Sequence, residues 1–79
     1  MTTWKPPQKW HLARKKRFRV TVRTAQTITQ RDLGGVTLTP LDGGLVQVES
    51  SGEDALDSLS YALNEYLTQP FEVVDEEVL

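Results

Sequence analysis

The sequence predicts an α+β domain with a three-stranded or, with a closing strand, four-stranded antiparallel sheet and one amphipathic helix packed across one face. We expect the order β-β-β-α-(β) behind an extended N-terminal arm. Three observations predict this fold: two-residue alternation in the first half of the chain, an Asp-Gly turn, and a helical apolar stripe in the second half. The 79 residues have material for one core. We therefore divide the chain into an arm (1–14), one α+β domain (15–74) and an acidic tail (75–79).

The first strand has the clearest pattern. From Lys16 onward apolar and polar side chains alternate, which places the two sets on opposite faces of a strand. The apolar set is Phe18, Val20 and Val22, and the polar set is Arg17, Arg19, Thr21 and Arg23. Residues 31–35 have turn composition, and alternation resumes over residues 36–39 and 45–49 on either side of Asp42-Gly43-Gly44. We expect residues 36–49 to form a hairpin.

The helix is expected after a capping box formed by Ser51 and Asp54. Its apolar stripe consists of Ala55, Leu56, Leu59, Ala62, Leu63 and Tyr66, at spacings of three and four. Gln69-Pro70 ends the helix, and residues 71–74 can return as a short fourth strand. The predicted core is Phe18, Val20, Val22, Val36 or Leu38, Val46, Val48, Leu56, Leu59, Leu63 and Tyr66.

The composition argues against catalysis. The chain has no cysteine, and its one histidine, His11, lies in the arm, so neither a nucleophile-histidine-acid set nor a metal site can be assembled. We therefore expect no enzyme activity, no cofactor, no metal and no small-molecule substrate. The N-terminus has no apolar run like that of a signal peptide, and no stretch has the length of a membrane span. These features predict a cytoplasmic protein without membrane contact.

Charge is strongly segregated along the chain. Residues 1–31 hold all nine Lys and Arg and no acid, whereas residues 32–79 hold all eleven Asp and Glu and no base, which gives the net charge of −2. A block of cations typically binds nucleic acid or an acidic protein surface. The alternative is internal neutralisation, in which the basic strand lies beside acidic ones. We favour an external partner, because exposed ion pairs contribute little to stability.

The cations define the candidate site. They can line one path on the arm and the first strand, with a spacing near that of backbone phosphates. The members are Lys9, Arg14, Lys15, Lys16, Arg17, Arg19 and Arg23. Trp4 and Trp10 flank the Pro6-Pro7 pair. Two roles remain open for these tryptophans: stacking on bases, or folding back to cap the core.

The predicted function is that of a small non-enzymatic binding module whose basic arm and first strand dock on an acidic surface. Nucleic acid, a nucleic-acid-processing machine or a larger nucleoprotein assembly is the favoured partner. The alternatives are a protein-binding accessory or inhibitor of a larger assembly, and a particle-structural protein.

Two resemblances accompany this prediction. The element order over residues 16–68 resembles small DNA-reading domains of the AP2 type and the arm-binding domains of tyrosine recombinases, whose sheet face enters the major groove. Residues 45–56 followed by 71–74 resemble the strand-helix-strand pattern of small phage-encoded inhibitors of bacterial RNA polymerase. These resemblances imply a DNA-contacting sheet face and a host-enzyme inhibitor, respectively.

Overall fold

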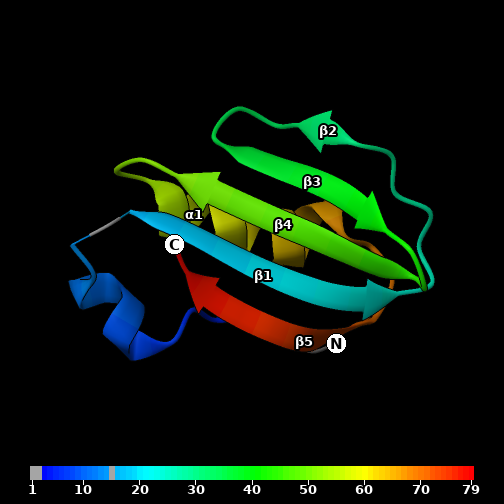
Figure 1. The fold of residues 1–79 in the computed structure, drawn as a ribbon, viewed down its shortest axis with the longest axis horizontal. Helices are drawn as coiled ribbons and strands as arrows, with labels where there is room; N and C mark the ends of the chain where they lie inside the picture. Colours follow the sequence, from blue (N-terminus) through cyan, green and yellow to red (C-terminus); the bar gives the residue numbers. More distant parts are fainter. Residues whose placement is uncertain (1–2, 15) are drawn as a thin grey trace.

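A computed structural model describes residues 3–14 and 16–79 of the chain. The strands form one antiparallel sheet in the order β2-β3-β4-β1-β5, and the helix lies across one face (Figure 1). They are β1 (Arg17–Thr24), β2 (Arg31–Asp32), β3 (Val36–Leu41), β4 (Leu45–Ser51) and β5 (Phe71–Val78). The α+β class with an antiparallel sheet and one helix is confirmed, but the sheet has five strands where three or four were predicted.

Strand β1 lies between β4 and the edge strand β5. Its alternation is the predicted one: Phe18, Val20 and Val22 are fully buried beneath the helix. Their polar neighbours in the sequence project from the opposite face, which no helix covers (Figure 1). This parity places a row of arginines on the open face.

The helical segment consists of α1 (Ala55–Tyr61) and a π-helical turn, η2 (Ala62–Tyr66). The predicted capping box does not form: Ser51 is the last residue of β4, and Asp54 is itself the N-cap and makes no side-chain cap hydrogen bond. Instead the buried Ser50 hydroxyl donates to the Ala55 carbonyl at 2.8 Å, which ties the first helical residue to β4.

The core lies between the helix and the sheet. Its buried apolar members are Trp4, Trp10, Phe18, Val20, Val22, Ile28, Val36, Leu38, Val46, Val48, Ala55, Leu59, Ala62, Leu63 and Leu67. Of the predicted core, Leu56 and Tyr66 are only partly buried and pack against its margin. Tyr66 also lies under the guanidinium of Arg31, 5.9 Å from its ring centroid, and so connects the helix to β2.

Two strands account for the difference in strand number. Residues 31 and 32, expected as part of a turn, pair with β3 as the short edge strand β2. Strand β5 runs through Val78, so that most of the expected acidic tail is strand. The physical reason is charge: β5 pairs with the cationic β1, which brings Glu72 opposite Arg23 and Glu77 opposite Arg19.

The predicted hairpin of β3 and β4 is present. Its turn contains Gly43 and Gly44 at φ of 79° and 75°, a conformation that side chains with a Cβ rarely adopt.

The N-terminal segment is not an extended arm. Residues Gln8–Leu12 form a 3₁₀ helix, η1, at one end of the sheet (Figure 1). The preceding residues run along the helix side of the fold: Thr3 lines a small pocket with Leu63 and Phe71. The Pro6-Pro7 pair favours an extended backbone locally, but the segment packs against the domain because Trp4 and Trp10 are buried in the core.

Candidate binding surfaces

The first candidate surface is the arginine face, defined as Arg17, Arg19 and Arg23 on the open side of β1. The register places Glu49 of β4 and Glu77 of β5 on either side of Arg19. Arg19 Nε lies 3.7 Å from Glu49 Oε2, and Arg19 Nη1 lies 3.3 Å from Glu77 Oε2. Arg19 therefore sits between two carboxylates in the middle of the face.

The other two arginines also have carboxylate partners. Arg17 Nη2 lies 2.7 Å from Glu49 Oε1, and Arg17 Nε donates to the same oxygen at 2.9 Å. Arg23 Nη1 lies 3.3 Å from Glu72 Oε1. A phosphate approaching this face would meet a glutamate already paired with each arginine. Internal neutralisation, the alternative left open by the sequence, is thus what the structure shows for these three cations.

The tryptophans are buried anchors. Trp10 is 2% exposed and stacks on Phe18, with ring centroids 4.9 Å apart and planes 21° apart. Trp4 lies beside Trp10 at a centroid distance of 6.1 Å. Both rings are therefore covered by protein, and neither presents a free face for a base. Of the two roles considered, the structure shows the fold-back role.

Polar contacts hold Trp4 in place. Its backbone N–H donates to Asn64 Oδ1 at 2.7 Å, and its carbonyl accepts from Asn64 Nδ2 at 2.9 Å. Its indole Nε1 donates to Glu76 Oε2 at 3.1 Å. The N-terminal segment is thereby tied to both the helical segment and β5.

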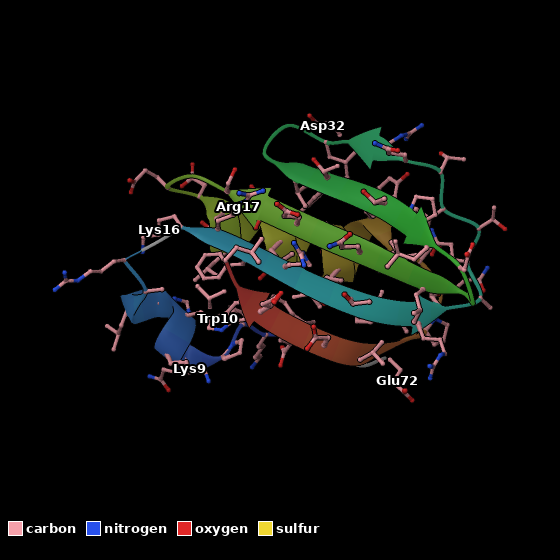
Figure 2. All side chains as sticks on the ribbon, viewed as in Figure 1. Lys9, Trp10, Lys16, Arg17, Asp32 and Glu72 are labelled. Atoms are coloured by element: carbon pink, nitrogen blue, oxygen red, sulfur yellow. The ribbon has the colours of Figure 1, made fainter. Side chains whose placement is uncertain are left out.

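The second candidate surface is the η1 surface, defined as Lys9, Leu12, Arg14 and Lys16. Lys9 and Lys16 lie at the same end of the sheet, beside the buried Trp10 (Figure 2). Leu12 is 85% exposed, the highest value among the exposed large apolar side chains of the described residues. Within the described part of the chain, none of the three cations has a carboxylate within 4.0 Å. Lys15, also predicted for the site, lies outside the described residues.

The structure therefore divides the predicted cation path in two. Arg17, Arg19 and Arg23 lie in ion pairs on the sheet, whereas Lys9 lies in η1 and Arg14 and Lys16 follow it in the sequence. The sequence reasoning missed Leu12, although an apolar residue between His11 and Arg14 was a visible signal. It also missed the glutamate partners, whose positions in β4 and β5 have the same outward parity as the arginines.

Residues 3–14 and 16–79 contain no cluster of three His, Asp or Glu side chains suited to a metal ion. His11 is exposed on η1. The pocket beside Thr3 is about 90 Å³ and its lining has no ionisable side chain, whereas a more open pocket is lined by Lys5, His11 and Asp57. Among the described residues, no helix has the length and apolar character required to cross a bilayer.

No family model matches the chain. Comparison with curated proteins and with solved structures likewise gives no significant match.

Proposed function

We propose that this chain is a small non-enzymatic module that docks on an acidic protein surface through the η1 surface, as an accessory or inhibitor of a larger assembly. The observation that carries the proposal is the exposure of Leu12 at the end of η1, in the same short segment as Lys9, Arg14 and Lys16. Lys9, Arg14 and Lys16 supply attraction to carboxylates, while Leu12 supplies an apolar side chain for a pocket on the partner.

The position of Leu12 supports this role. Trp10, two residues before it, is buried against Phe18, and Ala13, directly after it, packs against the core margin. Ala13 N–H also donates to the Trp10 carbonyl at 3.2 Å. Because the backbone is held on both sides, Leu12 is presented outward at a small entropic cost on binding. Such preorganised apolar anchors contribute strongly to protein–protein affinity.

A protein partner fits this arrangement better than a phosphate backbone. An exposed leucine gains little beside phosphates, whereas a pocket in an acidic protein surface desolvates it. The arginine face, which was expected to contact phosphates, already has glutamate partners.

Nucleic acid remains the second candidate, and one observation favours it. In the described part of the chain, Lys9, Arg14 and Lys16 have no carboxylate within ion-pair distance, so they are available to phosphates.

The test is affinity capture from lysate, with and without nuclease, using wild type and Leu12→Ser. Leu41→Ser is the matched control, because Leu41 is an exposed leucine on β3. We expect Leu12→Ser to lose the captured proteins, Leu41→Ser to keep them, and nuclease to have no effect.

A direct titration separates the two candidates. Single-stranded and duplex oligonucleotides are titrated at two salt concentrations against wild type and the Lys9→Ser/Arg14→Ser/Lys16→Ser variant. If nucleic acid were the partner, the triple variant would reduce the salt slope by roughly 0.9 for each phosphate deprived of its cation, and Leu12→Ser would bind normally. That result, with capture abolished by nuclease, would contradict the protein-docking proposal.

A further inference from the structure

The two edges of the sheet differ in length. Strand β2 forms one edge with two residues, whereas β5 forms the other with eight. A very short edge strand offers little for another chain to pair with, but a long one offers a row of backbone donors and acceptors. Within residues 3–14 and 16–79, no backbone hydrogen bond reaches β5 from the side away from β1. Among the described residues, the outer edge of β5 is thus unpaired.

The pairing pattern tells which backbone groups lie on this edge. The Leu79 N–H donates to the Arg17 carbonyl at 2.9 Å, so the backbone groups of Leu79 face β1. In an antiparallel ladder the direction alternates with each residue. The N–H and C=O groups of Val78 and Glu76 therefore point outward. The register shift near Val73 ends this regular stretch, which leaves Asp75–Leu79 as the part best suited to pairing.

The side chains along β5 combine apolar and acidic character. Val73, Val74 and Val78 are 36%, 45% and 42% exposed. Glu72, labelled in Figure 2, and Asp75 are exposed on the same strand. Asp75 lies opposite Thr21 and has no cation within 4.0 Å in the described part of the chain, unlike its neighbour Glu77. An adjacent strand would therefore meet uncompensated negative charge.

We propose that the outer edge of β5 accepts an extended basic segment of a partner protein as a sixth strand. The backbone groups of Glu76 and Val78 would pair with the segment, and Lys or Arg side chains would lie opposite Asp75 and Glu77. The molecule already contains such a pairing on the other side of β5, where the cationic β1 places Arg19 opposite Glu77. A partner strand with β1-like alternation of basic and apolar residues has the required chemistry.

A second copy of this chain fits the edge less well. Two-fold pairing of β5 with itself, centred on Asp75, places this residue opposite its own copy. A pair centred on Glu76 places Glu76 opposite its own copy and Asp75 opposite Glu77. A pair centred between Val74 and Asp75 places Glu72 opposite Glu77. Like charges directly opposite one another destabilise a strand pair. Charge therefore favours a basic partner over self-association.

The test uses three synthetic ten-residue probes with the full-length chain: alternating Lys-Val, alternating Glu-Val and alternating Lys-Pro. We expect only Lys-Val to shift the amide resonances of Glu76 and Val78 and to slow their hydrogen exchange. The Leu79 amide, already bonded to Arg17, changes little. The Lys-Pro probe keeps the charge but lacks the proline N–H groups that a strand pair needs.

Three results would overturn the proposal. The first is binding of Lys-Pro equal to that of Lys-Val, which would indicate attraction by charge alone. The second is a response confined to other residues, or no response. The third is protection of Glu76 and Val78 that rises with protein concentration without peptide, which would assign the edge to a second copy.

A charge variant tests the acidic contribution. Asp75→Lys should weaken Lys-Val binding roughly tenfold, since it replaces an attractive cross-strand pair by a repulsive one. Asp75→Asn should weaken Lys-Val binding about threefold. It serves as the test variant if Asp75→Lys disturbs the pairing of β5 with β1. The control is Asp42→Lys in the β3–β4 turn, which makes the same change in net charge. Equal weakening by the control would overturn the assignment to this edge.

This inference is independent of the proposed docking through η1. Leu12→Ser should leave Lys-Val binding unchanged, while Asp75→Lys should leave the η1-dependent captured proteins in place. Failure of one proposal is thus distinguishable from failure of the other.

Discussion

The η1 surface and the arginine face come from one basic stretch of sequence, yet they differ in what surrounds them. Each arginine of the face has a glutamate on a flanking strand within 3.3 Å. Lys9, Arg14 and Lys16 have no such neighbour in the described part of the chain, and Leu12 of the same segment is exposed. A run of cations in sequence therefore does not define one binding surface. Whether a cation is available to a partner depends on whether the fold places a carboxylate beside it.

The largest effect should come from the anchor of η1. Trp10→Ala removes a ring that is 2% exposed and stacked on Phe18, and should lower the free energy of unfolding by about 3 to 5 kcal/mol. Leu12→Ala, only two residues away, should change it by less than about 0.5 kcal/mol because that side chain is exposed. Urea denaturation of both variants measures the difference. Equal midpoints would show that η1 does not pack against β1.

An intermediate effect is expected from the arginine face. Replacing Arg17, Arg19 and Arg23 by Ser removes the cross-strand ion pairs and should cost about 1 to 3 kcal/mol in total. The difference from wild type should shrink at ~1 M salt, where the screening length falls to about 3 Å. A loss of stability that is independent of salt would mean that the arginines act through packing of their stems.

The matched control for that variant is the corresponding replacement of Lys9, Arg14 and Lys16. These cations have no ion-pair partner among the described residues, so the free energy of unfolding should change by less than about 0.5 kcal/mol. Similar losses of stability in the two triple variants would remove the distinction between the surfaces.

The smallest effect should appear within the arginine face itself. Arg19 lies between two carboxylates and its side chain is 32% exposed, whereas Arg23 has one partner and is 57% exposed. Arg19→Ser should therefore cost about 1 kcal/mol, and Arg23→Ser less than about 0.5 kcal/mol. Thermal unfolding at low salt has the resolution for this comparison. The reverse order would indicate that solvent exposure does not control the strength of these pairs.

The sequence predicted the features that depend on local periodicity. Alternation along β1 placed Phe18 and Val20 in the core and Arg19 on the open face, because strand parity is a property of adjacent residues. The Asp-Gly turn likewise predicted the β3–β4 hairpin. The helix stripe identified Leu59 and Leu63 as buried, since helical spacing is also local.

The features that were missed depend on contacts between distant residues. Glu77 resembles part of a solvated tail until β5 is paired with β1, 58 residues away at Arg19. The burial of Trp4 depends on Asn64 and Glu76, which no local pattern connects to it. The cations and aromatic residues of the candidate site were therefore visible in the sequence, but their surroundings could not be obtained from residue spacing alone.

The position of β1 between β4 and β5 has a consequence for folding. Its carboxylate partners are distant in sequence, 32 residues at Glu49 and 58 at Glu77, and sheets built on such contacts fold slowly. During synthesis the arginines of β1 emerge before the acids of β5. A nascent chain therefore carries Arg19 and Arg23 without Glu77 and Glu72 until β5 has been synthesised and has emerged, and we expect it to adhere to polyanions such as ribosomal RNA over that interval.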